Sequence, residues 1–275
     1  MRFLTNRNDL TKRIALLIEY KGKGLVGWQK QDNGISVQGE IEKAIQILYK
    51  TECHLQAAGR TDAGVNAFGQ VAHVDVPKNN EFSTKNNFYL VYALNSLLRK
   101  TNIRIISIQN TSNDFNARFS ATKRSYVYKF LCRTAPPSIL TNQVWHIQKR
   151  VDINAMKLAA NHLVGNHDFS SFRSTSCQAP SPIKTIDKFK FDFINDVLEM
   201  KVEAKSFLHN QVRIIAGSLI KVGTGLWNPD KIKQILDLRS RSKAGETAPP
   251  DGLYLEKVTY PKKFLNSKWP AYIND

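Results

Sequence analysis

The order of apolar segments in the first 110 residues is the feature that most constrains the fold of this chain. Residues 14–20 form a short aliphatic run that is typical of a strand. Ser36 precedes a segment with apolar residues every three or four positions, as on one face of a helix. A second stripe of this spacing lies within residues 88–98, and the β-branched run at 103–108 predicts another strand. With strand-like runs on both sides of a loop near residue 62, the predicted order is strand, helix, strand, loop, strand, helix, strand.

The second half of the chain contains hairpin patterns more often than strict alternation of strands and helices. Residues 125–132 place aromatic side chains at every second position, and residues 189–204 read as two strands joined at Asn195-Asp196. A helical stripe occupies residues 212–220. We therefore expect an α+β protein with mostly antiparallel sheets.

A run of small polar residues at 110–113 is the expected domain boundary. It predicts an N-terminal α/β domain at residues 1–110, which carries the Asp62 loop, and a C-terminal α/β domain at residues 111–275. The sequence shows no internal repeat. We therefore expect the two units to be similar in fold but not in sequence.

The charge balance indicates a polyanionic partner. The chain has 275 residues with 40 Lys and Arg against 23 Asp and Glu, a formal net charge of +17. Such an excess favours nucleic acid, because each phosphate contact by a basic side chain releases a condensed counterion. An anionic membrane surface is the competing interpretation, but no basic amphipathic helix is evident.

Hydropathy and cysteine usage predict a cytoplasmic protein that does not enter membranes. No segment approaches the roughly 20 apolar residues that span a bilayer, and the apolar run at 14–18 is too short for a signal peptide. The cysteines Cys53, Cys132 and Cys177 are odd in number and lack metal-ligand spacing, which is typical of a reducing compartment. The six histidines also lack ligand spacing, so no metal is expected.

A glycine pattern at residues 22–27 resembles a dinucleotide-binding loop only superficially. The dinucleotide fingerprint opens directly into a helix whose N-terminus holds the pyrophosphate. Here residues 28–34 intervene before the expected helix. We therefore expect a flexible basic loop at 22–27, and no cofactor.

The most suggestive site is the loop Gly59-Arg60-Thr61-Asp62-Ala63-Gly64. It lies between strand-like runs at 52–58 and 70–76 and places one carboxylate, Asp62, between two glycines and after an arginine. A scaffold presents reactive groups on loops of this kind. The spacing alone leaves open that this is a surface turn in which an aspartate tolerates unusual backbone angles.

Two further segments carry candidate functional residues. Residues 115–126 mix aromatic with basic side chains, a combination that suits an unstacked base and its phosphates, and Tyr126 heads the following strand. Arg213 lies on an apolar helical face. It either extends to water or turns inward to pair with a carboxylate.

These pieces together resemble the TruA-type tRNA pseudouridine synthases. The resemblance extends from about residue 13 to residue 260, and its motifs occur in the family's order. They are Gly27-Trp28-Gln29, Val37-Gln38-Gly39, Gly59-Arg60-Thr61-Asp62-Ala63-Gly64-Val65, Phe115-Asn116-Ala117-Arg118-Phe119, His167-Asp168-Phe169-Ser170-Ser171-Phe172 and Val212-Arg213.

The resemblance implies isomerisation of uridine to pseudouridine in the anticodon stem-loop of tRNA, at positions 38, 39 and/or 40. It implies the pseudouridine synthase fold, with two α/β units flanking a basic RNA-binding cleft, and a homodimer that binds tRNA. Asp62 would be the nucleophile toward a flipped-out uridine, with Tyr126 stacking on the base and Arg213 orienting the carboxylate. The residues expected to bind RNA are Lys23, Trp28, Gln29, Arg60, Arg118, Lys123, Arg124, His167 and Arg173.

The chain departs from the family pattern at two positions, and two other functions stay open. Asn66 stands where the family usually carries histidine, and Gln211 where methionine is usual. Asn66 keeps hydrogen-bonding ability but carries no charge, so we expect a structural role for this position. A non-catalytic tRNA-binding or folding module would need only the charge and the aromatics. A glycoside hydrolase-like enzyme would need two facing carboxylates, and only one acid has a convincing setting.

Overall fold

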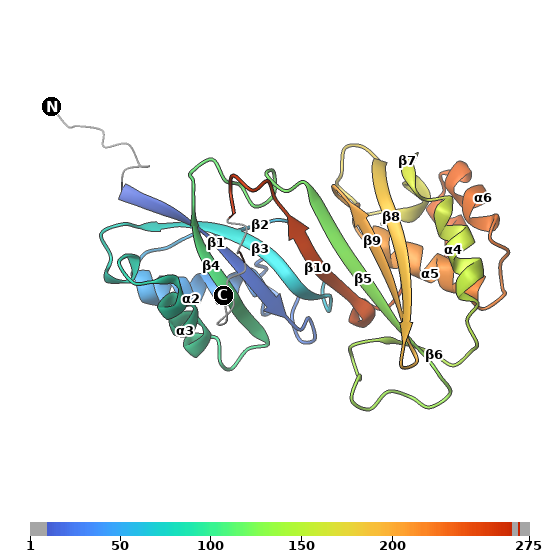
Figure 1. Ribbon diagram of the computed structural model, residues 1–275, viewed down its shortest axis with the longest axis horizontal. Coiled ribbons are helices and arrows are strands. Elements are labelled where there is room, and N and C mark those ends of the chain that lie inside the picture. The colour runs from blue at the N-terminus through green and yellow to red at the C-terminus, as the bar shows by residue number, and fades with distance from the viewer. Residues whose placement is uncertain (1–9, 266–268, 270–275) are drawn as a thin grey trace. The chain divides into compact units, whose positions relative to one another are not determined.

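The computed structural model describes residues 10–265 and residue 269 and divides the chain into two compact units. The first unit contains the described residues up to Thr122 and from Lys257 onward, and the second is Lys123–Glu256. Both units combine helices with mostly antiparallel strands, which confirms the expected α+β class (Figure 1).

The division differs from the expected boundary between residues 110 and 111. The polar run at 110–113 does not separate the units, because the loop that follows it returns to the first unit. In this loop the Ala117 N–H donates to Nδ1 of His73, and the Thr122 N–H donates to the Thr259 carbonyl oxygen. The chain therefore enters the second unit at Lys123 and returns to the first at Lys257.

In the first unit, the longest antiparallel pairings place β1 between β3 and β4. The strands are β1 (Thr11–Tyr20), β2 (Gln56–Ala57), β3 (Asn66–Pro77) and β4 (Ile103–Thr111). β2 pairs with β3 at Gln56–His73 and Ala57–Ala72. The strand expected at 52–58 is thus only two residues long. Consecutive residues of β1, Ile14, Ala15 and Leu16, are all buried, so both faces of this strand are covered.

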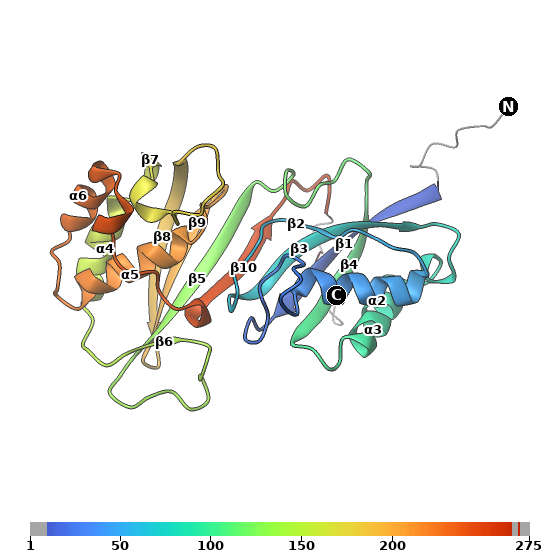
Figure 2. The same cartoon turned by 180° about the vertical axis from the view of Figure 1, so that it is seen from behind.

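Helices α2 (Val37–Tyr49) and α3 (Asn87–Leu97) lie beside one another on the strands of the first unit (Figure 2). Ser36 caps α2 as expected, since its Oγ accepts from the Gly39 N–H at 3.1 Å. The stripe expected on α3 is wrong at its first residue, because Phe88 is exposed and Leu90 and Leu94 form the buried face. A short 3₁₀ helix, η1 (Glu81–Ser83), precedes α3.

The second unit is built on β5, which pairs antiparallel with β9, while β8 pairs with β9 on one side and β7 on the other. β6 pairs parallel with β5. The strands are β5 (Lys123–Cys132), β6 (Trp145–Ile147), β7 (Gly165–Asp168), β8 (Ile183–Ile194) and β9 (Val197–Ala204). The expected hairpin turn at Asn195-Asp196 is confirmed, and both residues adopt the positive φ that two-residue hairpin turns require. β10 (Leu253–Thr259) begins in this unit and ends in the first.

Three helices and three short 3₁₀ segments complete the second unit. They are α4 (Ile153–Asn161), η2 (Ser170–Phe172), α5 (Gln211–Gly223), α6 (Lys231–Leu238), η3 (Arg241–Lys243) and η4 (Pro250–Gly252). α5 is the most deeply buried helix, with Ile214, Ile215 and Leu219 inaccessible to solvent. Within residues 10–265 and at 269, no helix has both the length and the apolar character needed to cross a membrane.

Candidate active site

Asp62 lies in the loop that joins β2 to β3 in the first unit. The Val65 N–H donates to the Asp62 carbonyl oxygen at 3.2 Å, and Gly64 has φ of 79°, so the chain turns sharply just after the carboxylate. Thr61 is buried, Asp62 is half-buried and Arg60 is exposed. The loop therefore presents one acidic and one basic side chain on a backbone that is anchored in the core.

A buried polar cluster beneath the loop fixes its backbone. The Tyr20 hydroxyl lies 2.7 Å from Oγ1 of Thr61, and Nε2 of Gln70 donates to the Gly59 carbonyl oxygen at 2.8 Å. Burial raises the pKa of Tyr20 to about 12, so its hydroxyl stays neutral and keeps the proton that this cluster needs. Alternation alone did not single out Tyr20, Thr61 or Gln70. The one indication in the sequence was Gln70, a polar residue that lies between the apolar residues of β3.

The segment between β1 and α2 forms a second support. The Trp28 N–H donates to the Thr61 carbonyl oxygen at 3.0 Å. A Cβ on Gly27, where φ is 107°, would lie 2.6 Å from that same oxygen, and a Cβ on Gly22 would lie 2.4 Å from the Val65 carbonyl oxygen. Only glycine lets the two backbones approach this closely. The loop at 22–27 is therefore a brace for the Asp62 loop.

Asn66 takes part in the same brace. Its Oδ1 accepts from the Gly22 N–H at 2.9 Å, and its side chain is buried. This hydrogen bond is consistent with the structural role expected for Asn66. An amide serves here because the partner is a backbone donor, which needs an acceptor and no charge.

The structure places the RNA-binding candidates of the first unit in different environments. Lys23, Gln29 and Arg60 are exposed. Trp28 is only 3% exposed and packs near Tyr20, with ring centroids 6.3 Å apart. Its side chain packs within the core behind the Asp62 loop, so it is too buried for the direct RNA contact expected from the sequence.

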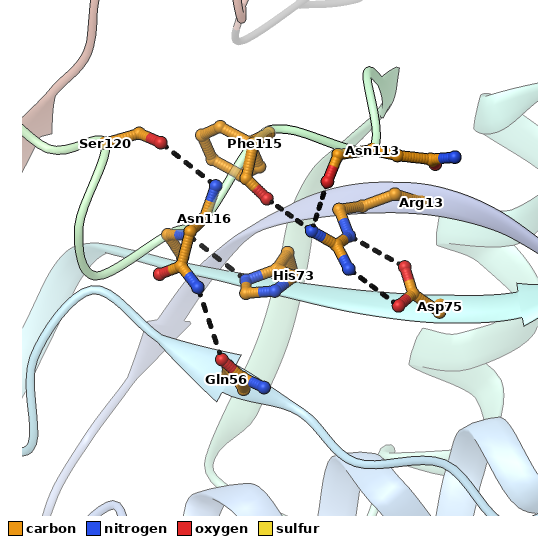
Figure 3. Close-up of polar contacts among 9 residues, drawn as sticks. Arg13, Gln56, His73, Asp75, Asn113, Phe115, Asn116 and Ser120 are labelled. Atoms are coloured by element: carbon orange, nitrogen blue, oxygen red, sulfur yellow. Dashed lines mark hydrogen bonds and ion pairs between the residues drawn. The ribbon is translucent and has the colours of Figure 1, made fainter. Parts of the chain in front are cut away.

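Arg118 is exposed on the loop at residues 112–121. This loop is hydrogen-bonded to His73 of β3 and, through Asn116, to Gln56 of β2 (Figure 3). Arg13 forms a two-pronged ion pair with Asp75, each N–O distance being 2.7 Å. Its remaining nitrogen donates to the carbonyl oxygens of Asn113 and Phe115. One arginine of β1 thus fixes the start of this loop.

In the second unit, Tyr126 and Arg213 are both half-buried. The Tyr126 ring meets Phe207 edge to face at 5.2 Å. Arg213 donates from Nε to the Ala248 carbonyl oxygen at 2.7 Å and from Nη1 to Oδ1 of Asn210 at 3.0 Å. These bonds hold the guanidinium in one orientation. Tyr126 and Arg213 belong to the second unit, whereas Asp62 belongs to the first.

The remaining candidates of the second unit have partners within the protein. Lys123 contacts Glu203 at 2.9 Å, and this hydrogen bond raises the pKa of the lysine. Arg124 is buried and donates to the Lys205 carbonyl oxygen, and Nε2 of His167 lies 2.8 Å from the Val164 carbonyl oxygen. Arg173 is half-buried. Lys123, Arg124 and His167 each have a hydrogen bond within the protein that would compete with a phosphate. Arg173 is therefore the best placed of these four residues to bind one.

Among the described residues, no group of three or more His, Cys, Asp or Glu side chains has an arrangement that would hold a metal ion. Gln211 uses its Oε1 to accept from the Leu208 N–H at 2.8 Å, which stabilises the start of α5. Gln211, which stands where the family usually carries methionine, therefore has a structural role of its own at the start of α5.

Comparison with known proteins gives a consistent family. The tRNA pseudouridine synthase family model matches residues 159–261. The tRNA pseudouridine synthase A of Rhizobium meliloti is 44% identical over 250 residues, covering 90% of this chain and 99% of the relative. The protein of the same name from Brucella ovis is 45% identical over 251 residues, covering 90% of this chain and 98% of the relative.

Among solved structures, a Cbf5–Nop10–Gar1 complex is similar with a TM-score of 0.31 and 11% identity, covering 75% of this chain and 54% of that chain. These values are too low to indicate more than a remote likeness. The identity to the two bacterial proteins over nearly their whole length is decisive, and this chain belongs to the TruA family of tRNA pseudouridine synthases.

Proposed function

We propose that this protein isomerises uridine to pseudouridine in the anticodon stem-loop of tRNA, at positions 38, 39 and/or 40, with Asp62 as the nucleophile. The observation that carries the proposal is the Asp62 loop: a half-buried carboxylate on a backbone fixed from two sides by buried hydrogen bonds. Catalytic groups need such a rigid support, because small displacements of a reacting atom cost large factors in rate.

The reaction needs one well-placed carboxylate and no change of oxidation state. The bond between N1 of uracil and C1′ of ribose breaks, the detached base turns, and a new bond forms between C5 and C1′. The proton on C5 is lost to solvent and N1 takes up a proton, so the product is an isomer of the substrate. Asp62 either attacks a carbon of the nucleotide or removes a sugar proton to form a glycal, and both routes end in the same isomer. The target base must first leave the stem, as in other enzymes that act on a base within a duplex.

Other side chains have supporting roles in this proposal. Arg60 either fills the space that the flipped-out base leaves in the stem or binds the adjacent phosphates. Its side chain is exposed, as both roles require. Tyr126 stacks on the extruded uracil. Arg213 pairs with Asp62 and orients it, and its bonds to Ala248 and Asn210 hold the planar guanidinium in position for this role.

The proposed RNA-binding surface is a basic cleft that includes Lys23, Gln29, Arg118 and Arg173. The contacts of Lys123, Arg124 and His167 within the protein give these residues smaller expected contributions. We also propose that the protein acts in the cytoplasm as a homodimer, which sedimentation of the purified protein with and without tRNA would test.

The decisive experiment compares wild type with Asp62→Asn. Pure protein is incubated with unmodified tRNA and no added cofactor, and pseudouridine is mapped by nucleotide. Wild type should modify positions within 38–40, while Asp62→Asn should form no product and bind tRNA with affinity within about two-fold, since the change removes an anion near phosphate. Asp32→Asn, which makes the same change at an exposed acid of the first unit, should behave as wild type.

Two outcomes would overturn the proposal. The first is wild-type protein that binds tRNA and leaves every uridine unchanged. The second is full rescue of a deletion strain by Asp62→Ala, which would identify a non-catalytic tRNA-binding or folding module.

A further inference from the structure

Phe119 is an exposed aromatic residue in a loop that is otherwise well anchored. Its side chain is 78% exposed, whereas Phe115, four residues earlier, is fully buried against Tyr260 and His73. Leaving a phenylalanine in water forgoes the roughly 25 cal/mol per Å² that burial of apolar surface provides. An exposed aromatic on a rigid support is therefore a candidate contact for a partner.

The turn that carries Phe119 is held by its own hydrogen bonds. Oδ1 of Asn116 accepts from the N–H groups of both Arg118 and Phe119, at 2.9 and 3.0 Å. The Asn116 N–H donates to Oγ of Ser120, and the Ser120 N–H donates back to the Asn116 carbonyl oxygen. Two residues thus close the turn from both ends and fix the backbone beneath the phenylalanine.

The same turn is fixed to the strands that lead into the Asp62 loop (Figure 3). Nδ1 of His73 on β3 accepts from the Ala117 N–H at 3.1 Å, and Nδ2 of Asn116 donates to Oε1 of Gln56 on β2 at 3.4 Å. Burial lowers the pKa of His73 to about 4, so its ring is neutral near pH 7 and offers the lone pair that this bond requires.

This attachment limits the distance between the turn and the carboxylate. Gln56 precedes Asp62 by six residues, and a fully extended chain spans at most about 3.3–3.6 Å per residue, or about 20 Å in total. The backbone of Gln56, whose side chain holds the turn, therefore lies within about 20 Å of the Asp62 backbone, in the same unit of the protein.

The chemistry of the turn fits RNA. The Arg118 guanidinium carbon lies 5.5 Å from the centroid of the Phe119 ring, so a cation and an aromatic face are presented together. Unpaired bases stack on such rings, and the neighbouring cation binds a phosphate. The net charge of +17 favours RNA over a second copy of this basic chain as the partner.

We propose that Phe119 is a stacking platform for an unpaired base of the substrate RNA, with Arg118 binding an adjacent phosphate. His73, Asn116 and Gln56 are positioning residues that hold this platform at a fixed place relative to Asp62. The inference rests on the proposed function, since it takes the bound RNA to be the substrate.

The test uses the full chain and unmodified tRNA, with variants Phe119→Ala, Phe119→Leu, Phe119→Trp and Arg118→Ala. Loss of one stacked base weakens binding by roughly 5- to 150-fold, so Phe119→Ala and Phe119→Leu should raise Kd and KM by a factor in this range. Phe119→Trp should restore affinity, and its added indole fluorescence should be quenched on binding. Tyr92→Ala, which removes another strongly exposed aromatic of the first unit, should bind as wild type.

Salt dependence separates the two side chains. Arg118→Ala should reduce the slope of log affinity against log salt by about one phosphate contact, whereas the Phe119 variants should keep the wild-type slope. A Phe119→Ala variant with wild-type Kd and KM would overturn the inference. A Phe119→Ala variant that changes the sedimentation mass but binds tRNA normally would also overturn it and would place the residue in a protein interface. If wild type itself forms no pseudouridine, the proposed function fails instead.

Discussion

Replacement of Gly27 by alanine should uncouple catalysis from tRNA binding. A Cβ at this position would lie 2.6 Å from the Thr61 carbonyl oxygen, whereas ordinary contact begins near 3.4 Å. The Asp62 loop or the brace must therefore move by about 0.8 Å. The moving oxygen also accepts the 3.0 Å bond from the Trp28 N–H, and the next residue in the chain is the carboxylate.

The expected loss can be divided into two parts. The backbone of an alanine at φ of 107° is strained, and this strain lowers the free energy of unfolding by about 1–3 kcal/mol. The displacement of Asp62 acts on the reaction, and a misplacement of about 1 Å can reduce rate about 100-fold. We expect kcat to fall by roughly this factor while the Kd for tRNA stays within about two-fold.

Gly24→Ala is the matched control, since Gly24 has φ of 81° but a Cβ there would meet nothing within 4 Å. This variant should lose about 1–2 kcal/mol of stability through backbone strain alone and keep wild-type kcat. Urea unfolding and single-turnover pseudouridine formation measure the two quantities. Wild-type kcat in Gly27→Ala, or an equal loss of kcat in both variants, would refute the argument that the brace sets the position of Asp62.

Two further predictions concern the buried polar groups of the first unit. Tyr20→Phe removes the hydroxyl bonded to Thr61 and leaves a buried partner unsatisfied, so urea unfolding should show a loss of about 1–3 kcal/mol; unchanged stability would contradict this role. For His73, burial lowers the folded-state pKa from 6.5 to about 4, so the unfolded chain binds more protons between these pH values. The free energy of unfolding should therefore decrease as pH falls from 6.5 to 4, by at most about 1.4 kcal/mol per pH unit, and His73→Gln should remove this contribution. An identical pH dependence in wild type and His73→Gln would show that His73 does not titrate as described.

The sequence predicted most elements because their patterns are local. The cap at Ser36, the β-branched strand β4 and the turn at Asn195-Asp196 each depend on residues within a few positions. The face of α3 was wrong at Phe88 because the helix carries apolar side chains on more than one face. Only packing decides that Leu90 and Leu94 are buried while the aromatic residues Phe88, Tyr89 and Tyr92 are exposed. The extent of β2 depends on its pairing with β3, which local propensity does not encode.

For the site, sequence reasoning selected Asp62, Arg60, Tyr126 and Arg213 from motif spacing and family resemblance. It also treated Trp28 as an RNA contact and the loop at 22–27 as flexible. In the structure the backbone of residues 22–28 packs against residues 61–65, so the loop is a support for the Asp62 loop, and Trp28 is buried. Contacts between segments about 40 residues apart leave no periodic trace in the sequence.

By itself the sequence determined the family and the strongly basic charge, and it singled out Asp62 as the acidic residue of the proposed site. These properties follow from residue identity and order alone. Tertiary structure alone decided which residues hold that acid in place and that the loop bearing Arg118 and Phe119 is fastened to β2 and β3. The physical reason is that hydrogen bonds between distant backbone and side-chain groups exist only after the strands have paired, since pairing is what brings Tyr20, Gln70 and His73 to the places where they act.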